Sequence, residues 1–314
     1  MNLIRRILVR SSESRWLRER APRFEFVRGA AARFMPGEKP EDALVAARSL
    51  AESGIHSLLT QLGENIAGRA EAEAVVTHYL DLLDRIRTAN LPAEVSVKLT
   101  QLGLDLDREF CSANLETLIE RSRAGAPAAE KTLWIDMEQS SYVEATLELY
   151  ARARKSHPNV GVCVQAYLRR TEKDVESLVS MGAAVRLVKG AYSEPPEIAF
   201  PKKDDVDESY FRLAQTLWSP EARRAGVRAV MATHDRRLIA RLTQWAAAQG
   251  IAENQLEFAM LFGIQRGEQV RLAREGYRSG VLISYGSFWF PWFMRRLAER
   301  PANALFLVRN LFSS

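Results

Sequence analysis

The sequence predicts an α/β protein built as a (β/α)8 barrel, and three patterns in its 314 residues support this fold class. Short runs rich in Val, Ile and Leu alternate with helical segments, and eight such pairs follow one another along the chain. The runs are almost continuously apolar, as in parallel strands covered on both faces. Each run ends in polar or glycine residues, where a barrel of this kind carries its active-site mouth.

The elements follow in order along the chain. Residues 1–53 have helical spacing, interrupted at Phe34-Met35-Pro36-Gly37, and we expect them to form an N-terminal helical segment before a barrel domain over residues 54–314. Among the helices between strands, residue Thr171 can cap one start, with Asp174 three residues later. The strands expected are residues 55–62, 94–99, 132–135, 160–164, 184–188, 227–231, 255–260 and 279–283.

After the eighth strand comes the segment SYGSFWFPWFMRRLAERPAN, residues 284–303. Pro291 suits a first helical turn and Pro301 would stop the helix. Glu299 lies four residues after Arg295 and three after Arg296, so it can brace either guanidinium. Two fixed arginines beside an aromatic wall suit a small carboxylate with an apolar body. The alternative is an amphipathic helix whose arginines face solvent.

Composition places the chain among ordinary globular proteins, with 47% apolar and 26% charged residues. Two cysteines make neither a disulfide framework nor a metal cluster, so we expect a cytoplasmic protein without a metal site. No apolar run is long enough for a membrane span, and no segment has the order of a signal peptide. The glycine-rich turns that hold nucleotides in Rossmann and Walker sites do not occur.

The net charge of +5 is concentrated at the N-terminus, where residues 1–33 hold nine arginines against three glutamates. This basic, partly amphipathic stretch predicts peripheral contact with an anionic membrane, on its inner face, or with an acidic partner. The alternative is an ordinary basic surface helix. Nucleic-acid binding is disfavoured, because no basic stripe or aromatic platform recurs later in the chain.

Polar residues at the carboxyl ends of the strands should converge on one mouth. Two of them, Lys98 and Arg186, sit inside apolar strands, where a cation is costly unless it is paired or faces a site. Some of these cations can instead form structural ion pairs, and Lys189 can be read as a Schiff-base lysine of an aldolase-like barrel. The residues expected at the mouth are Lys98, Asp136, Gln165, Arg186, Lys189, Tyr192, Thr233, His234 and Glu257.

Seven segments together resemble the proline dehydrogenase family in its monofunctional bacterial form. They occur in the family's order from the second strand to the last helix, and VRLVKGAY and RRLAER are the most specific. The segments are VSVKLTQLGLD (95–105), IDMEQ (135–139), VQAYLRR (164–170), VRLVKGAY (185–192), ATHD (232–235), EFAMLFG (257–263) and RRLAERPAN (295–303).

The resemblance implies a distorted TIM barrel with a final helix over its mouth, noncovalent FAD, and oxidation of L-proline to Δ1-pyrroline-5-carboxylate by hydride transfer to flavin N5. It further implies a membrane quinone as electron acceptor. A separate pyrroline-5-carboxylate dehydrogenase would act downstream, because the chain is too short to include one. By their match to family positions, the substrate residues are Lys98, Tyr192, Leu261, Arg295, Arg296 and Glu299. The flavin residues are Asp136, Met137, Gln165, Arg186, Val188, Lys189, Gly190, Ala191, Thr233 and His234.

The sequence departs from the family pattern at the substrate pocket. Leu282 and Trp292 stand where many members have tyrosine, Ala259 replaces a frequent glutamine, and Ser193 replaces a common tryptophan. Tyr285 is a candidate to fill part of the space at Leu282. Hydroxyproline or another cyclic imino acid is therefore an alternative substrate, and a barrel that does not bind flavin is the remaining alternative.

Overall fold

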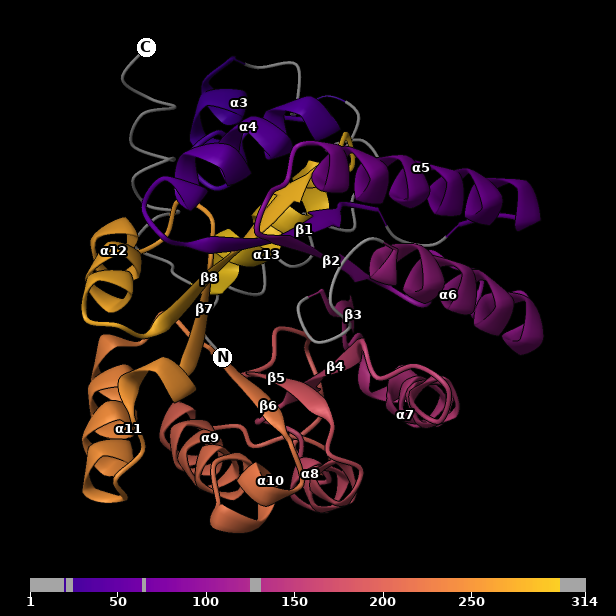
Figure 1. Cartoon of the computed structure of the whole chain (residues 1–314). Coiled ribbons are helices and arrows are strands. Elements are labelled where there is room, and N and C mark those ends of the chain that lie inside the picture. Colours follow the sequence, from indigo (N-terminus) through magenta and orange to yellow (C-terminus); the bar gives the residue numbers. More distant parts are fainter. Residues whose placement is uncertain (1–19, 21–24, 64–65, 125–130, 300–314) are drawn as a thin grey trace.

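The computed structural model describes residues 20, 25–63, 66–124 and 131–299, and side chains at 25–26 and 295–299 lie outside the description. Eight parallel strands close into one barrel in sequence order, because β8 pairs with β1. Helices surround the strands (Figure 1), which confirms the predicted fold class. The strands are β1 (His56–Gln61), β2 (Ala93–Val97), β3 (Leu133–Ile135), β4 (Val160–Gln165), β5 (Ala184–Val188), β6 (Arg228–Ala232), β7 (Glu257–Leu261) and β8 (Arg278–Tyr285).

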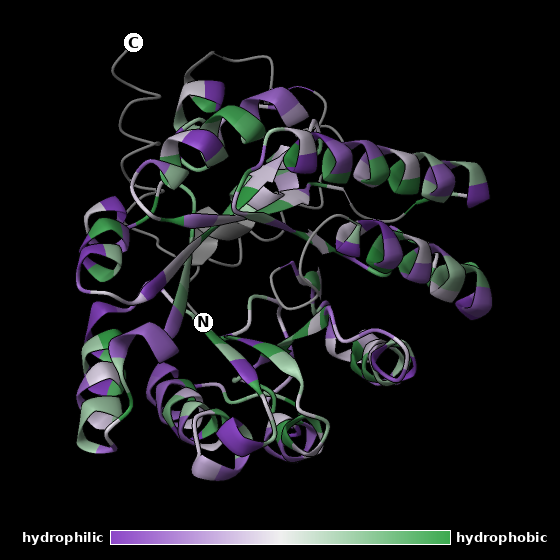
Figure 2. Ribbon diagram, in the orientation of Figure 1, coloured by the Kyte–Doolittle hydropathy of each residue, from purple (hydrophilic) through white to green (hydrophobic). Residues whose placement is uncertain are grey.

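The helices alternate with the strands as the sequence pattern predicts. Apolar residues recur among polar ones along α5 and α6 (Figure 2), and the buried positions have helical spacing. Each of these helices therefore has one apolar face that packs on the outer surface of the barrel. The helices are α3 (Glu25–Ala31), α4 (Pro40–Ala51), α5 (Arg69–Thr88), α6 (Arg108–Arg123), α7 (Val143–Arg154), α8 (Thr171–Ser180), α9 (Lys203–Leu217), α10 (Pro220–Arg224), α11 (Arg236–Ala248), α12 (Arg266–Arg274) and α13 (Trp289–Glu299).

Side chains alternate between the barrel interior and the layer under the helices, as the two-residue period of a strand requires. On β8, Ile283 packs in the large cluster shared with the helices, whereas Leu282 packs against a small interior cluster. That interior cluster comprises Leu58, Trp134, Ala184, Val230 and Ala259. Strand side chains two residues apart therefore form successive interior layers between the two ends of the barrel.

The N-terminal helices pack on the barrel and on its last helix. Ala43 and Ala47 of α4 belong to the same buried cluster as Leu59 of β1. Val27 and Ala31 of α3 join a second cluster, which includes Trp289, Phe290, Trp292 and Phe293 of α13. The indole nitrogen of Trp289 also donates to the Glu38 carboxylate at 2.8 Å. The division into two domains at residues 53 and 54 remains a prediction.

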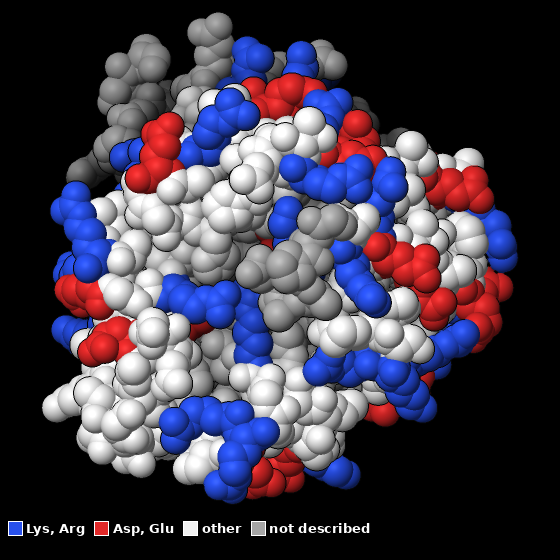
Figure 3. Space-filling view, in the orientation of Figure 1, with Lys and Arg blue, Asp and Glu red and all other residues white. Residues whose placement is uncertain are grey.

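Several surface ion pairs join neighbouring helices. Acidic and basic side chains lie interspersed along the edge that carries α5, α6 and α7 (Figure 3). Arg121 on α6 contacts Asp84 on α5 at 2.6 Å, and Arg152 on α7 contacts Glu109 on α6 at 2.7 Å. Such exposed pairs contribute at most about 1 kcal/mol each. Among the described helices, none combines the length and apolarity needed to cross a membrane.

Two expectations from the sequence are wrong in detail. Glu257 does not lie at the mouth, because it is the first residue of β7 and therefore sits at the opposite end of the barrel. Thr171 does not cap α8 but is its first residue, and its hydroxyl donates to the Gln165 carbonyl oxygen at 2.6 Å. The hydroxyl group thus holds the end of β4 instead of the helix start.

Candidate functional site

The carboxyl ends of the strands bring most of the predicted site residues together. Every second residue of a strand faces the barrel interior, and the predicted site residues occupy these interior-facing positions. Ser96 precedes Lys98 by two residues, Trp134 precedes Asp136, and Ala259 precedes Leu261. The residues that end or directly follow their strands at these positions are Lys98, Asp136, Gln165, Val188 and Leu261, with Arg186 one layer deeper.

Arg186 is the central charged group of this region, and its side chain is 3% exposed. Its Nε donates to the Cys163 sulfur at 2.7 Å, and one Nη2 hydrogen bond reaches the Ser96 hydroxyl at 2.7 Å. The same Nη2 forms an ion pair with Asp136. Because β5 and β2 are not neighbours in the sheet, the contact with Ser96 crosses the barrel interior. A buried cation is stable here because a carboxylate and two neutral groups surround it.

Further contacts fix the orientation of this guanidinium. The Ser96 hydroxyl donates to Asp136 Oδ1 at 2.8 Å, so the carboxylate is held from two strands. Burial raises the pKa of the Cys163 thiol to about 11, so the sulfur beside Arg186 is a neutral thiol at pH 7. The guanidinium carbon of Arg186 also lies 5.3 Å from the centre of the Trp134 ring, within the range of a cation–π contact.

Two buried polar atoms at this position have no hydrogen-bond partner among the described residues. One is Nη1 of Arg186 and the other is Oε1 of Gln165. The Gln165 amide nitrogen is held by the carbonyl oxygens of Glu138 at 3.2 Å and Met137 at 3.5 Å. A donor and an acceptor are thus left over in a buried setting, which is costly unless a ligand satisfies them.

The turn after β5 requires its glycine. Gly190 has a φ of +112°, and a Cβ atom there would lie 2.2 Å from the Tyr167 ring. Ala191 and Tyr192 follow, both half-buried. The absence of a side chain at Gly190 therefore lets the turn pack closely against Tyr167 at the mouth.

Lys98 and the β6 turn complete the described part of the mouth. Lys98 is 9% exposed, and its Nζ donates to the Gly63 carbonyl oxygen at 3.3 Å. Thr233 is buried, His234 is half-buried, and the Thr233 hydroxyl accepts from the backbone nitrogen of Asp235 at 3.2 Å. In the ranges that the structure describes, no three His, Cys, Asp or Glu side chains are placed to hold a metal ion.

Lys189 lies at the outer edge of the mouth in a network of ion pairs. Its Nζ contacts Asp207 of α9 at 2.5 Å and Asp235, which caps α11, at 3.0 Å. Lys203, the first residue of α9, contacts the same two carboxylates. A Schiff-base role would need a neutral amine in an apolar pocket, so this environment disfavours the aldolase-like alternative.

The arginine pair predicted to bind substrate falls where side chains are not described. The backbone of Arg295, Arg296 and Glu299 belongs to α13, which leaves β8 at the mouth end of the barrel. Their side chains lie outside the described residues, so their roles remain predictions. The aromatic residues before them are described, and Trp292 is 8% exposed in the cluster shared with α3.

Several residues around the site were missed from the sequence. Ser96, Cys163 and Trp134 contact Arg186 or its partners. Asp207 forms an ion pair with Lys189, and Lys203 contacts the same carboxylate. The first three lie two residues before a predicted site residue on the same strand, so the strand period could have found them. Asp207 and Lys203 follow a long loop, and no sequence pattern points to them.

At the other end of the barrel lies a separate buried ion network. Arg228 Nη1 contacts Glu94 at 2.6 Å and Nη2 contacts Glu257 at 2.7 Å, while the His56 ring lies 3.1 Å from Glu257. Arg228 also lies 5.3 Å from the Trp134 ring centre, so this ring has a guanidinium on each side along the barrel axis. The network explains why Glu257 is charged although it is far from the mouth.

The fold and the mouth define a (β/α)8 barrel with a buried arginine–aspartate pair at its carboxyl end. The chain matches the family model described as Proline dehydrogenase over residues 43–309. It is 36% identical over 281 residues to Proline dehydrogenase 1 of Bacillus subtilis strain 168, covering 90% of each chain. The chain therefore belongs to the proline dehydrogenase family of oxidoreductases, as the sequence motifs indicate.

Two further comparisons agree with this assignment. The Deinococcus radiodurans proline dehydrogenase is 37% identical over 284 residues, which cover 90% of this chain and 89% of that protein. A crystal structure of proline utilization A from Bdellovibrio bacteriovorus, inactivated by N-propargylglycine, superposes with a TM-score of 0.78 at 25% identity. That match covers 86% of this chain and 32% of the much longer solved chain.

Proposed function

We propose that this protein oxidises L-proline to Δ1-pyrroline-5-carboxylate with noncovalent FAD, the first step of proline catabolism. The observation that carries the proposal is Arg186, a buried cation held by Asp136 with one Nη1 hydrogen-bonding group left over. Family membership supports the reaction class. FAD, when bound, would supply the hydride acceptor at its N5 atom.

The described residues fit a flavin ring and its polar chain. Arg186 Nη1 can donate to the cofactor and stabilise charge on the reduced ring, while Gln165 Oε1 accepts from it. The turn at Gly190 and Ala191, which packs on the Tyr167 ring, would offer its backbone to the polar chain of the cofactor. The residues that we propose to line the cofactor are Asp136, Met137, Gln165, Arg186, Val188, Lys189, Gly190, Ala191, Thr233 and His234.

The substrate would lie between the cofactor and α13. Lys98, buried near the end of β2, can attract a carboxylate together with Arg295 and Arg296, whose guanidinium groups Glu299 would brace. Tyr192 and Leu261 are half-buried at the mouth, where they can pack against the substrate ring. Fixing the carboxylate orients the reacting ring carbon, so the contribution of these residues is chiefly positioning.

A specific observation favours a second substrate. Leu282 faces the barrel interior, whereas Tyr285 is fully buried on the outer side, and its hydroxyl bonds the His78 ring at 2.8 Å. Tyr285 therefore does not fill the space at Leu282. The hydroxyl of hydroxyproline, or a substituent of another cyclic imino acid, would therefore not meet the Tyr285 side chain.

Electron transfer to a membrane quinone and the following reaction complete the proposal. A peripheral site on the inner face of the membrane, reached through the basic residues 1–33, would bring the cytoplasmic protein near its quinone. A separate pyrroline-5-carboxylate dehydrogenase would then consume the product. We propose no nucleic-acid partner.

Anaerobic reduction of the bound flavin tests the function. Purified protein should be yellow, and L-proline should bleach its flavin absorbance in the absence of oxygen. Comparison of the bleaching rates with L-proline and trans-4-hydroxyproline decides between the two substrates. Protein that binds FAD but keeps its spectrum with both imino acids would contradict the proposed reaction. Colourless protein that takes up no added FAD would contradict the cofactor.

A further inference from the structure

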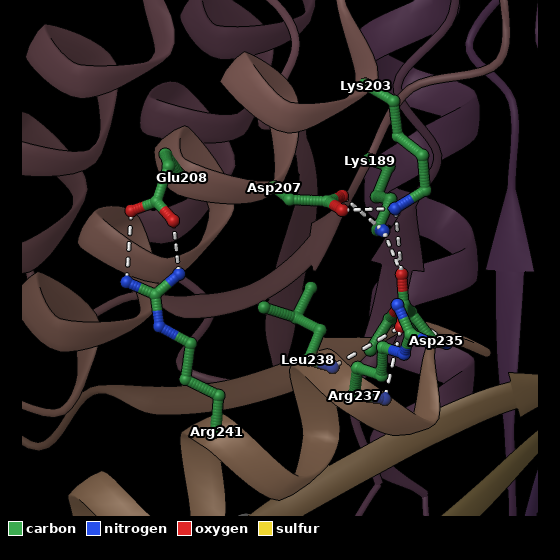
Figure 4. Close-up of polar contacts among 9 residues, drawn as sticks. Lys189, Lys203, Asp207, Glu208, Asp235, Arg237, Leu238 and Arg241 are labelled. Carbon is green, nitrogen blue, oxygen red and sulfur yellow. Dashed lines mark hydrogen bonds and ion pairs between the residues drawn. The ribbon is translucent and has the colours of Figure 1, made fainter.

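Two lysines and two aspartates form an ion cluster at the edge of the mouth, made of Lys189, Lys203, Asp207 and Asp235 (Figure 4). They come from three elements, because Lys189 follows β5, Lys203 and Asp207 lie in the first turns of α9, and Asp235 precedes α11. The two carboxylates reach the two ammonium groups from different directions (Figure 4). We call these four residues the mouth ion cluster.

Each lysine in the cluster contacts both aspartates. Lys189 Nζ lies 2.5 Å from Asp207 Oδ1 and 3.0 Å from Asp235 Oδ2. Lys203 Nζ lies 3.2 Å from the same Asp235 oxygen and also bonds Asp207 Oδ2. Two positive charges thus balance two negative charges. Either ammonium can leave while the other still bridges both carboxylates.

The acidic half of the cluster is fixed, whereas its lysines have longer side chains. Asp235 Oδ1 accepts from the backbone nitrogens of Arg237 at 3.1 Å and Leu238 at 3.3 Å, as an N-cap does. Asp207 lies one helical turn after Lys203, the spacing at which such a pair meets. The Lys203 side chain is 68% exposed and that of Lys189 is 26% exposed. Lys189 is therefore the ammonium nearer the mouth.

We propose that Lys203 is a positioning residue that acts through Lys189. It serves as the second counter-ion for Asp207 and Asp235, so that Lys189 can turn its ammonium toward a phosphate of a dinucleotide without leaving both carboxylates unpaired. The inference rests on the proposed function, since it takes FAD as the ligand and Lys189 as one of its contacts. A phosphate oxygen is the acceptor that a released lysine ammonium satisfies best at this edge.

The charge balance gives the expected sign. Without Lys203, the two aspartates carry a net excess of one negative charge and hold Lys189 more firmly. Between charges about 4 Å apart in partly exposed surroundings, an effect on the order of tenfold in affinity is expected. FAD should therefore dissociate more readily from Lys203→Met than from the unmodified protein.

The test measures FAD released from diluted holoprotein by its fluorescence. Lys203→Met should raise the FAD dissociation constant about tenfold, while Lys203→Arg, which keeps the charge, should leave it within about twofold. Lys202→Met is the matched control, because it removes an equal charge from an adjacent exposed lysine. The visible spectrum of the remaining bound flavin and the KM for proline should not change. Equal dissociation constants for Lys203→Met and Lys202→Met would overturn the inference.

A double-mutant cycle separates action through Lys189 from direct contact with FAD. Lys189→Met alone should weaken FAD binding, and adding Lys203→Met should then produce little further loss. Asp207→Asn in the Lys203→Met background should restore affinity, because it returns the cluster to neutrality. Multiplicative losses in the lysine double variant would assign Lys203 a direct contact and overturn the positioning role. Failure of the unmodified protein to hold FAD would instead refute the proposed function.

Discussion

At the scale of single residues, the site depends on placing one cation where solvent cannot reach it. Arg186 is buried with Asp136, Ser96 and Cys163 around three of its hydrogen-bonding directions. Breaking such a pair by removing one partner costs more than the pair itself contributes, because a charge is left unpaired. The two remaining N–H groups, both on Nη1, are the donors that we propose to face the flavin.

Gly190 offers a test at this scale. Substitution by alanine should destabilise the protein by about 1–3 kcal/mol, because the left-handed backbone is strained and the new methyl group meets the Tyr167 ring. FAD should also be lost more readily, since the turn that faces it must move. Thermal unfolding and flavin content measure the two effects. Gly267→Ala is the control, because its Cβ would meet nothing within 4 Å and it lies in a helix. Equal stability of the two variants would refute the assigned constraint.

The buried Glu257 makes stability depend on pH. Burial would raise the pKa of this carboxyl, but the charge of Arg228 and hydrogen bonds from His56 and Arg228 hold the pKa well below its usual range. A lowered folded-state pKa adds stability above the ordinary glutamate pKa, and this stability is lost as the pH falls through the folded-state value. The contribution should therefore be full at neutral pH and decline below about pH 4.

Glu257→Gln should thus destabilise the protein at pH 7 by about 3 kcal/mol, the lower end for a broken buried pair, because Glu94 still faces Arg228. Chemical denaturation at pH 7 and below pH 4 should show the difference from wild type shrinking in acid. Glu275→Gln, at an exposed pair with Arg271, should change stability by less than about 1 kcal/mol. A difference from wild type that is constant with pH would contradict the assigned ion pair.

At the scale of elements, strand positions followed from apolar runs, and strand ends followed from the polar residues after them. The position of Glu257 was mispredicted for two reasons. β7 begins two residues later than the predicted strand, and a charged residue next to an apolar run was taken to mark the carboxyl end of the strand. Its partner Arg228 lies 29 residues away along the chain, and Glu94, the other carboxylate that pairs with Arg228, lies 163 residues away. Only the closed barrel brings the three side chains together. The prediction that Thr171 caps a helix was wrong because its hydroxyl donates to the Gln165 carbonyl oxygen instead.

Some features of the site could not be read from the sequence for a physical reason. Ser96 and Cys163 hold Arg186 from strands that lie 90 and 23 residues earlier, and their roles depend on which strands face each other. Lys203 pairs with Asp235 across 32 residues, after a loop without a regular pattern. The residues found from the motifs lie at the mouth because each one is at the end of its own strand. The role of a missed residue depends on its contact with a distant part of the chain, which exists only in the closed barrel.

Helix α13 carries the prediction about substrate. Its apolar residues Trp289 and Phe293 pack with α3, which fixes the helix before Arg295. Arg295→Met should raise the KM for proline and leave the flavin bound, because a charge-assisted hydrogen bond to carboxylate contributes about 1.5–3 kcal/mol. Steady-state kinetics and flavin content provide the measurement, with Arg274→Met on α12 as the control. An unchanged KM would remove Arg295 from the substrate site.

At the scale of the whole molecule, the net positive charge of the chain is concentrated in its N-terminal residues. Residues 1–33 carry nine arginines and three glutamates, whereas the rest of the chain is nearly neutral at −1, from a total of +5 less +6. On the described surface, neighbouring helices pair charges locally, as the contacts between α5, α6 and α7 show. The excess positive charge thus lies within residues 1–33 of the sequence.

Deleting residues 1–20 tests whether this segment brings the enzyme to its electron acceptor. The deletion stops before α3, so the packing of Val27 and Ala31 against α13 is retained. Activity with a soluble acceptor should therefore persist, while activity with quinone in anionic vesicles should fall, and co-sedimentation with those vesicles should weaken at low salt. Replacing the arginines among residues 1–20 with glutamine should reproduce the loss without shortening the chain. Equal loss with both acceptors would assign the segment a structural role, because membrane attraction acts only on the reaction that takes place at the bilayer.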